Sequence, residues 1–309
     1  MNELFAQKVE EARLGKHSEG MDIMGSLVRS SYGEKEAPRK PSPVRAEKEE
    51  VGKPKLSDSD ILGNAFVMIV AGHETTANSI HFSLMELAMN LRAQRAVQKE
   101  VQAIFGDEPP EKWEYDANIN NLLGGMLGAV LNEQLRLMPP VITIPKHVTK
   151  SQDQVIILDG KKIKLPAGAH IALDTIAVHR NPRYWPTQLS KISGGENDLD
   201  DFKPERWLCK TTPNDSQQID SAPESEDEEE AFGQFTGRNI SAQLFHPVRG
   251  SYLPFSDGAR SCLGRRLAYV KIMGVLAVIF QEYSIELAVD ESNQFREIRG
   301  SASKESSRG

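Results

Sequence analysis

Residues 255–264 read FSDGARSCLG, and this decapeptide decides the fold. Its cysteine, Cys262, directly precedes an apolar stretch from about residue 263 to 283 whose spacing predicts a helix. A single cysteine is most often a small buried hydrophobic residue. The start of a helix, however, supplies free backbone N–H groups and the positive end of the helix dipole, and both favour a thiolate.

The neighbours of Cys262 favour a ligand over a buried hydrophobic residue. Gly258 permits a turn that a Cβ would obstruct, Gly264 lets a flat partner approach closely, and Arg260 offers a planar fork for carboxylates. A thiolate in this setting is suited to a metal macrocycle with acidic side groups. From Phe255 onward the decapeptide resembles the haem-binding signature of cytochromes P450, Phe-x-x-Gly-x-Arg-x-Cys-x-Gly, at all five specified positions. The resemblance implies that Cys262 is the axial ligand of haem iron and that the other four residues form the haem site.

A second motif is Glu133 followed by Arg136. By itself this spacing is typical of a surface ion pair on a helix, which contributes only about 0.2–0.5 kcal/mol. Beside the decapeptide it resembles the Glu-x-x-Arg motif of the same family, and residues 202–207 (FKPERW) resemble the segment that adds a second arginine, here Arg206. The resemblance implies a structural role, in which the three side chains form a buried ion network below the thiolate.

A third motif, AGHETT at 71–76, lies in the middle of a long predicted helix. Glycine and threonine are weak helix formers, so we expect the helix to loosen here and to leave room for a ligand. The His-Glu-x-x-His motif of zinc proteases is incomplete, because residue 77 is Ala. The segment instead resembles the P450 motif over the distal haem face. That resemblance implies that Glu74 and Thr75 are the acid and alcohol that relay protons to bound dioxygen.

Two further segments carry weaker signals. Lys146 lies where many family members have an arginine that binds a haem propionate, and it is either such a contact or an ordinary surface lysine. Residues 179–182 (HRNP) resemble a family stretch that serves packing rather than chemistry.

Composition limits the function classes. The formal charge of −7 is concentrated in residues 224–230 (ESEDEEE), and the remainder sums to about −1, which excludes a general basic attraction to nucleic acid. Two cysteines in 309 residues cannot form a disulfide framework, so a reducing compartment is expected. The longest apolar runs are far shorter than the roughly 20 residues that span a bilayer.

The remaining pattern predicts a mainly α chain with a small β-region, the cytochrome P450 fold, truncated at its N-terminus. We expect residual N-terminal helices and a polar loop in 1–56, a haem-binding core in 57–290 with a disordered acidic insertion at about 208–250, and a polar tail in 291–309. Within the core, patterning predicts helices at 61–91, 93–105 and 119–138, and a small sheet with a hairpin within 144–172.

The resemblance implies monooxygenation with haem b as cofactor. One oxygen atom from O2 enters a small apolar organic substrate, and NADPH supplies electrons through NADPH-cytochrome P450 reductase. A full-length relative is expected in the endoplasmic reticulum membrane through an N-terminal anchor. This chain, which lacks such a segment, is expected to be cytoplasmic.

Two alternatives remain open. One is a P450-type dehydratase or isomerase, although such relatives lack the acid and alcohol pair represented by Glu74 and Thr75. The other is a non-catalytic, haem-poor remnant, because family members are commonly about half as long again as this chain and the missing part is N-terminal.

Overall fold

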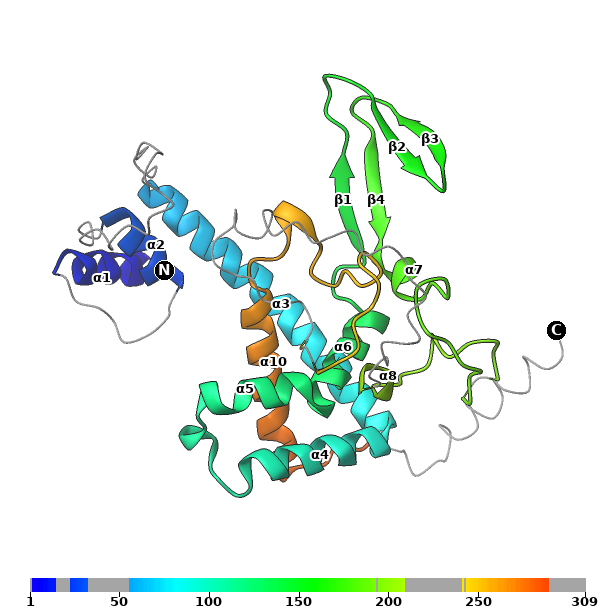
Figure 1. Ribbon diagram of the computed structural model, residues 1–309. Coiled ribbons are helices and arrows are strands. Elements are labelled where there is room, and N and C mark those ends of the chain that lie inside the picture. Colours follow the sequence, from blue (N-terminus) through cyan, green and yellow to red (C-terminus); the bar gives the residue numbers. More distant parts are fainter. Residues whose placement is uncertain are drawn as a thin grey trace, which may run out of the picture. The chain divides into compact units, whose positions relative to one another are not determined.

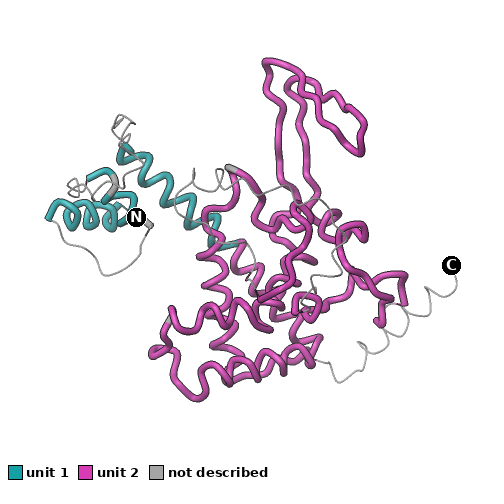
Figure 2. The backbone as a smooth tube through the Cα atoms, viewed as in Figure 1, with its two compact units in different colours: residues 1–74 teal, residues 75–309 magenta. Residues whose placement is uncertain are grey.

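The computed structural model describes residues 2–14, 23–32, 56–192, 194–208, 241 and 243–288. The chain divides into two compact units, residues 1–74 and 75–309 (Figure 2). Most of the predicted polar loop, the acidic insertion and the C-terminal tail lie outside the described residues.

The first unit contains two amphipathic helices, α1 (Asn2–Arg13) and α2 (Ile23–Tyr32), and the start of α3 (Asp58–Met89). Helices α1 and α2 lie within residues 1–56, where patterning predicts N-terminal helices. The core of the first unit consists of Met24, Val28, Ile61 and Ala65. At the start of α3, the Ser57 and Asp60 side chains each accept a hydrogen bond from the other's backbone N–H, at 3.1–3.2 Å, which forms a capping box.

Helix α3 continues without interruption through residues 71–76, so the predicted loosening of the helix is wrong. Each weak helix former costs about 1 kcal/mol or less, whereas the helix continues through many hydrogen-bonded residues on both sides. The Ser79 hydroxyl donates to the Thr75 carbonyl oxygen at 3.1 Å without breaking the helix. The boundary between the two units falls within α3, between Glu74 and Thr75.

The second unit is built around one buried helix, α6 (Met126–Leu137), all of whose residues are buried. Helix α6 packs against α4 (Leu91–Phe105), α5 (Tyr115–Gly124), α8 (Glu205–Leu208) and α10 (Arg265–Glu282). Figure 1 labels these helices. The short α7 (Thr175–His179) also contacts it, and 3-10 turns lie at Pro110–Lys112 and Gly258–Arg260. Because α6 is surrounded by helices, any polar side chain that it carries must find its partner within the protein.

A break at Gly125 separates α5 from α6, so the prediction of one continuous helix over 119–138 is wrong. Gly125 is extended, with φ −105° and ψ −157°, and a Cβ there would lie 1.8 Å from Glu100 Oε1. Glu100 Oε2 accepts a hydrogen bond from Leu127 N–H at 3.0 Å. Burial raises the pKa of Glu100, and backbone donors from Leu127 and Met126 partly offset the rise. The carboxylate thus caps the start of α6, which ordinary helix signals do not reveal.

The β-region consists of two separate antiparallel pairs rather than one small sheet. Strands β1 (Thr143–His147) and β4 (His170–Asp174) pair with each other, and the hairpin β2 (Gln154–Leu158) and β3 (Lys161–Leu165) lies between them in sequence (Figure 1). The predicted hairpin is present, and its turn lies at Asp159 and Gly160, whose φ values of +48° and +74° suit a tight hairpin of this kind.

Candidate functional site

The segment that precedes α10 forms a closed turn, here called the Cys262 loop (residues 253–264). Cys262 N–H donates to the Phe255 carbonyl oxygen at 2.9 Å, and Ser261 N–H donates to the Gly258 carbonyl oxygen at 2.9 Å. Ser256 and Gly258 have φ values of +62° and +76°, which bend the backbone back on itself. A positive φ is unfavourable for residues that have a Cβ, so glycine at position 258 suits the turn.

The exposed side chains of the loop are suited to binding a haem. The Cys262 thiol is exposed, and no described residue hydrogen-bonds or pairs with the exposed Arg260 guanidinium. Leu263 is 83% exposed, which is unusual for so large an apolar side chain. A Cβ at Gly258 would meet no atom within 4 Å. A thiol, an unpaired cation and an apolar side chain in open space together fit an apolar ring that carries iron and acidic groups.

The Cys262 loop rests on a buried aromatic base. The Phe255 ring lies 5.3 Å from the Tyr269 ring of α10. The hydroxyls of Tyr252 and Tyr269 donate to Asn132 Oδ1 in α6, at 3.0 and 2.8 Å. Burial raises the pKa of both phenols, so each keeps its proton and remains a donor.

A second connection runs from α7 through His179, which is fully buried. Its Nε2 accepts a hydrogen bond from Leu253 N–H at 2.7 Å, and its Nδ1 donates to the Arg136 carbonyl oxygen at 3.2 Å. These partners require a neutral ring with its proton on Nδ1. Burial, with an opposing contribution from the Arg136 carbonyl and a further lowering by the Arg136 charge, brings the pKa of His179 down to about 4.

Below the loop, Glu133 is the centre of a buried ion cluster. Its carboxylate accepts two hydrogen bonds from Arg136 at 2.8 Å and one from Arg206 Nε at 3.1 Å. Trp207 Nε1 and the Lys203 backbone N–H also donate to it, at 2.9 and 3.1 Å. A buried carboxylate with this many donors is fully compensated, although removing one partner would leave a buried charge.

The two arginines extend this cluster into the rest of the unit. Arg136 donates to the carbonyl oxygens of His179 and Leu199, at 3.2 and 2.7 Å. Arg206 donates to the Asp198 carbonyl oxygen at 2.7 Å. Burial raises the pKa of Asp198, but hydrogen bonds from Lys203 and the Gln188 backbone and the charge of Arg206 lower it overall.

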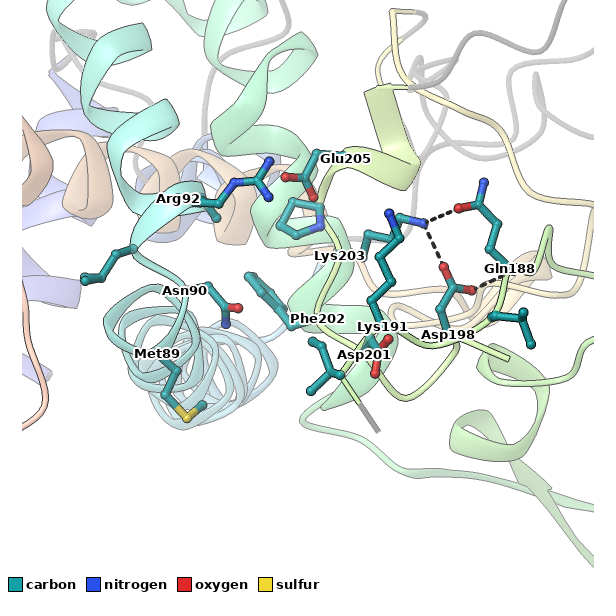
Figure 3. A pocket seen from close by; sticks show the side chains of 15 residues that line it. Met89, Asn90, Arg92, Gln188, Lys191, Asp198, Asp201, Phe202, Lys203 and Glu205 are labelled. Carbon is teal, nitrogen blue, oxygen red and sulfur yellow. Dashed lines mark hydrogen bonds and ion pairs between the residues drawn. The ribbon is translucent and has the colours of Figure 1, made fainter. Parts of the chain in front are cut away.

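A cavity of about 630 Å³ opens behind this cluster (Figure 3). One wall is the junction of α3 and α4, and the other is formed by residues 188–205, where Lys203 Nζ bonds Asp198 at 2.8 Å and Gln188 at 3.1 Å. None of the residues that line it belongs to the Cys262 loop. We therefore assign this cavity no part in the chemistry at Cys262.

The other predicted site residues lie on α3 and β1. Glu74 is exposed and Thr75 is half-buried, on consecutive positions of α3. Lys146 is exposed on β1, opposite Ile171 of β4, and no described residue pairs with its amine. Among the residues that the structure describes, no hydrogen bond or ion pair links Lys146 to the Cys262 loop.

Sequence reasoning missed the residues that hold the loop from within. Asn132, Tyr252 and Tyr269 carried no motif, and Trp207 was visible only as a neighbour of Arg206. One feature of the sequence could have indicated Asn132. It is a polar residue directly after the apolar residues 126–131 of a predicted helix, and a buried polar side chain needs a partner. Local spacing could not have indicated which partners it meets.

Two further features are absent from the described residues. No helix in that part of the chain combines the length and the apolar character needed to span a bilayer. Within the same residues, no three His, Cys, Asp or Glu side chains gather as a possible metal cluster.

Comparison with known proteins agrees with the loop chemistry. The family model described as Cytochrome P450 matches residues 39–307. A cytochrome P450 monooxygenase of Arthrobotrys oligospora is 27% identical over 299 residues, which cover 94% of this chain and 45% of the relative. Cytochrome P450 monooxygenase 124 of Postia placenta is 29% identical, covering 81% and 38%, and human cytochrome P450 4F2 is 29% identical, covering 77% and 36%. The chain thus spans less than half the length of these relatives.

Proposed function

The chain belongs to the cytochrome P450 family, and from this membership we propose that it carries the haem-binding part of a haem-thiolate monooxygenase. In the proposed reaction one oxygen atom of O2 enters a small apolar organic substrate. The observation that carries the proposal is the exposed Cys262 thiol in a turn closed by its own N–H bond to Phe255. Such a turn presents the sulfur at a fixed place in the loop, where it would bind the haem iron.

Each of the five signature residues in the loop has a proposed role in binding haem b. Cys262 binds the iron, and Phe255 keeps the loop against the core through its contact with Tyr269. Gly258 and Gly264 leave the ring room to approach, and Arg260 binds an acidic side group of the haem. Lys146, an exposed cation on β1, is proposed as a second such contact, although its ammonium lacks the bidentate geometry of an arginine.

When bound, the haem supplies the activation of dioxygen with electrons that NADPH-cytochrome P450 reductase delivers. The protein must then provide protons, and we propose Glu74 and Thr75 for this task. A carboxylic acid beside a hydroxyl can pass a proton along a short hydrogen-bonded path and recover it from water. The exposed position of Glu74 suits the end of such a path that meets solvent.

The ion cluster has a supporting role in this proposal. Glu133, Arg136 and Arg206 bind one another and nearby backbone carbonyl groups, and all three are buried. We propose that they keep α6 and the segment around Arg206 at a constant distance from the Cys262 loop. Their charges are too deeply buried to act on a substrate.

The organisation and location of the protein follow as further proposals. Residues 57–290 form the haem-binding core, residues 1–56 supply N-terminal helices and a polar loop, and residues 291–309 form a polar tail. Because the chain spans less than half of its relatives, the electron partner and a location at the endoplasmic reticulum membrane are proposed for the whole protein.

The full chain, expressed with haem, tests the proposal by absorption spectroscopy. We expect the reduced carbon-monoxide complex to show the band of thiolate-ligated haem. Cys262→Ala should abolish this band, and Cys209→Ala, the matched change at the other cysteine, should retain it. A thiolate band that survives Cys262→Ala would contradict the proposal. Folded protein that takes up no haem would favour a non-catalytic remnant, and turnover of hydroperoxides without a reductase would favour a dehydratase or isomerase.

A further inference from the structure

One side chain of α6 connects both ends of the Cys262 loop. Asn132 is 2% exposed, and its Oδ1 accepts hydrogen bonds from the hydroxyls of Tyr252 and Tyr269. Its Nδ2 donates to the Gly128 carbonyl oxygen at 2.9 Å. A carbonyl oxygen can only accept, so the Gly128 carbonyl selects the amide nitrogen on its side and leaves Oδ1 facing the two hydroxyls.

The two tyrosines flank the cysteine in sequence. Tyr252 lies ten residues before Cys262, at the entry to the loop, and Tyr269 lies seven residues after it, in the first turns of α10. Both are buried, with 8% and 7% of their surface exposed. Asn132 Oδ1 therefore binds the chain on each side of the loop, and the Asn132 backbone carbonyl is a second acceptor for Tyr252 alone, at 3.2 Å.

Buried phenols make this attachment specific. Removing a hydroxyl from water is unfavourable unless an acceptor in the protein replaces the water. Each tyrosine is therefore held where its hydroxyl reaches Asn132. The two hydroxyls also interact with each other, which couples the two sides of the loop. By contrast, packing alone would allow the aromatic rings to slide by small distances.

We propose that Asn132 is the positioning residue that fixes the two arms of the Cys262 loop and thereby the place of the thiol. The purpose of this arrangement rests on the proposed function, in which Cys262 binds haem iron. The arrangement itself can be tested without haem. Asn132 does not touch the cysteine and acts only through the two tyrosines.

The test measures hydrogen–deuterium exchange of the peptide that contains Cys262, in the full chain without haem. Its reporter is the Cys262 N–H, which bonds the Phe255 carbonyl oxygen. We expect Tyr252→Phe and Tyr269→Phe each to speed exchange of this amide by about fivefold to tenfold, the effect of one net hydrogen bond. Tyr184→Phe is the matched control, because no described residue hydrogen-bonds the Tyr184 hydroxyl, and it should leave exchange unchanged. Unchanged exchange in both loop variants would overturn the proposal.

Asn132→Leu and a triple variant, Asn132→Leu with both Tyr→Phe changes, separate positioning from stability. The single variant removes the acceptor of the Tyr269 hydroxyl and leaves the Tyr252 hydroxyl only the backbone carbonyl oxygen of residue 132, at 3.2 Å. We therefore expect a lower thermal midpoint and fast exchange at Cys262. The triple variant buries no orphaned polar atom, so its midpoint should recover while exchange at Cys262 stays fast. Recovery of slow exchange in the triple variant would overturn the proposal. If Asn132→Leu does not fold, the two Tyr→Phe variants decide the question alone.

Haem provides a second readout that keeps this proposal apart from the proposed function. In haem-loaded protein, the two Tyr→Phe variants should lower the share of the reduced carbon-monoxide complex that absorbs as thiolate-ligated haem, and Tyr184→Phe should not. If the unaltered chain binds no haem, the proposed function fails, and the exchange experiment still tests the positioning role of Asn132. If haem binds through the thiolate equally in all variants, the positioning role fails and the proposed function stands.

Discussion

A Cβ on Gly128 would lie 2.1 Å from the carbonyl oxygen of Leu123. Leu123 belongs to the last turn of α5 and Gly128 to the first turn of α6, so the two helices meet at backbone contact. This contact is possible because the chain breaks at Gly125 and the Glu100 carboxylate caps the new helix. The arrangement places Asn132 and Glu133 at the centre of the second unit.

Gly128→Ala should therefore destabilise the protein. The added methyl group meets backbone atoms that cannot rotate away, and overpacking of this kind costs about 1–3 kcal/mol. Gly274→Ala in α10 is the matched control, because a Cβ there meets no atom within 4 Å. The control should stabilise its helix by about 0.5–1 kcal/mol, since alanine is the better helix former. Urea unfolding of the full chain measures both, and equal stability of the two variants would contradict the backbone contact.

Glu133→Gln should be strongly destabilising although it preserves the shape of the side chain. The neutral amide leaves the Arg136 guanidinium buried without a counter-charge and turns an NH2 group toward other donors. Breaking a buried pair in this way costs about 3–5 kcal/mol. Glu282→Gln, at an exposed position of α10, should change the free energy of unfolding by less than about 0.5 kcal/mol. A mild effect at Glu133 would mean that the cluster is not a closed ion network.

Stability should fall with acid because of His179. Its pKa is about 4 in the folded chain and 6.5 when unperturbed, so the unfolded state binds more protons between these values. The free energy of unfolding should decrease as the pH falls from about 6.5 to 4, by roughly 3 kcal/mol in total. Protonated His179 could no longer accept from Leu253 N–H.

Comparison of two histidine variants isolates this contribution. His179→Gln cannot titrate and should flatten the pH dependence of unfolding between pH 6.5 and 4, at the cost of lower stability at pH 7. His170→Gln, at an exposed position on β4, should leave the wild-type slope unchanged. The same slope in both variants would show that another group causes the acid sensitivity.

Thr75→Ala should separate haem binding from proton delivery. We expect the thiolate band of the reduced carbon-monoxide complex to persist, since Thr75 is on α3 and not in the Cys262 loop. With reductase and NADPH, hydrogen peroxide released per NADPH oxidised should rise and product formation should fall by at least about tenfold. Thr75→Ser, which keeps the hydroxyl, should restore coupling. Full coupling in Thr75→Ala would remove Thr75 from the mechanism.

Much of the secondary structure was predictable because its causes are local. The Ser57 capping box, the apolar run of α10 and the turn at Asp159 and Gly160 each depend on residues a few positions apart. The break at Gly125 was not predictable in this way. It depends on Glu100, which lies on another helix and reaches the start of α6 only after the chain has folded.

The sequence by itself determined the family, through the decapeptide around Cys262, and the mainly helical composition of the core. Only the tertiary structure decided that Asn132, Tyr252 and Tyr269 meet at one oxygen and that His179 bonds Leu253. The physical reason is the range of the interactions. Helix signals and ligand motifs arise between near neighbours in the chain, whereas buried hydrogen bonds select partners by their position in space, and that position exists only after the helices have packed.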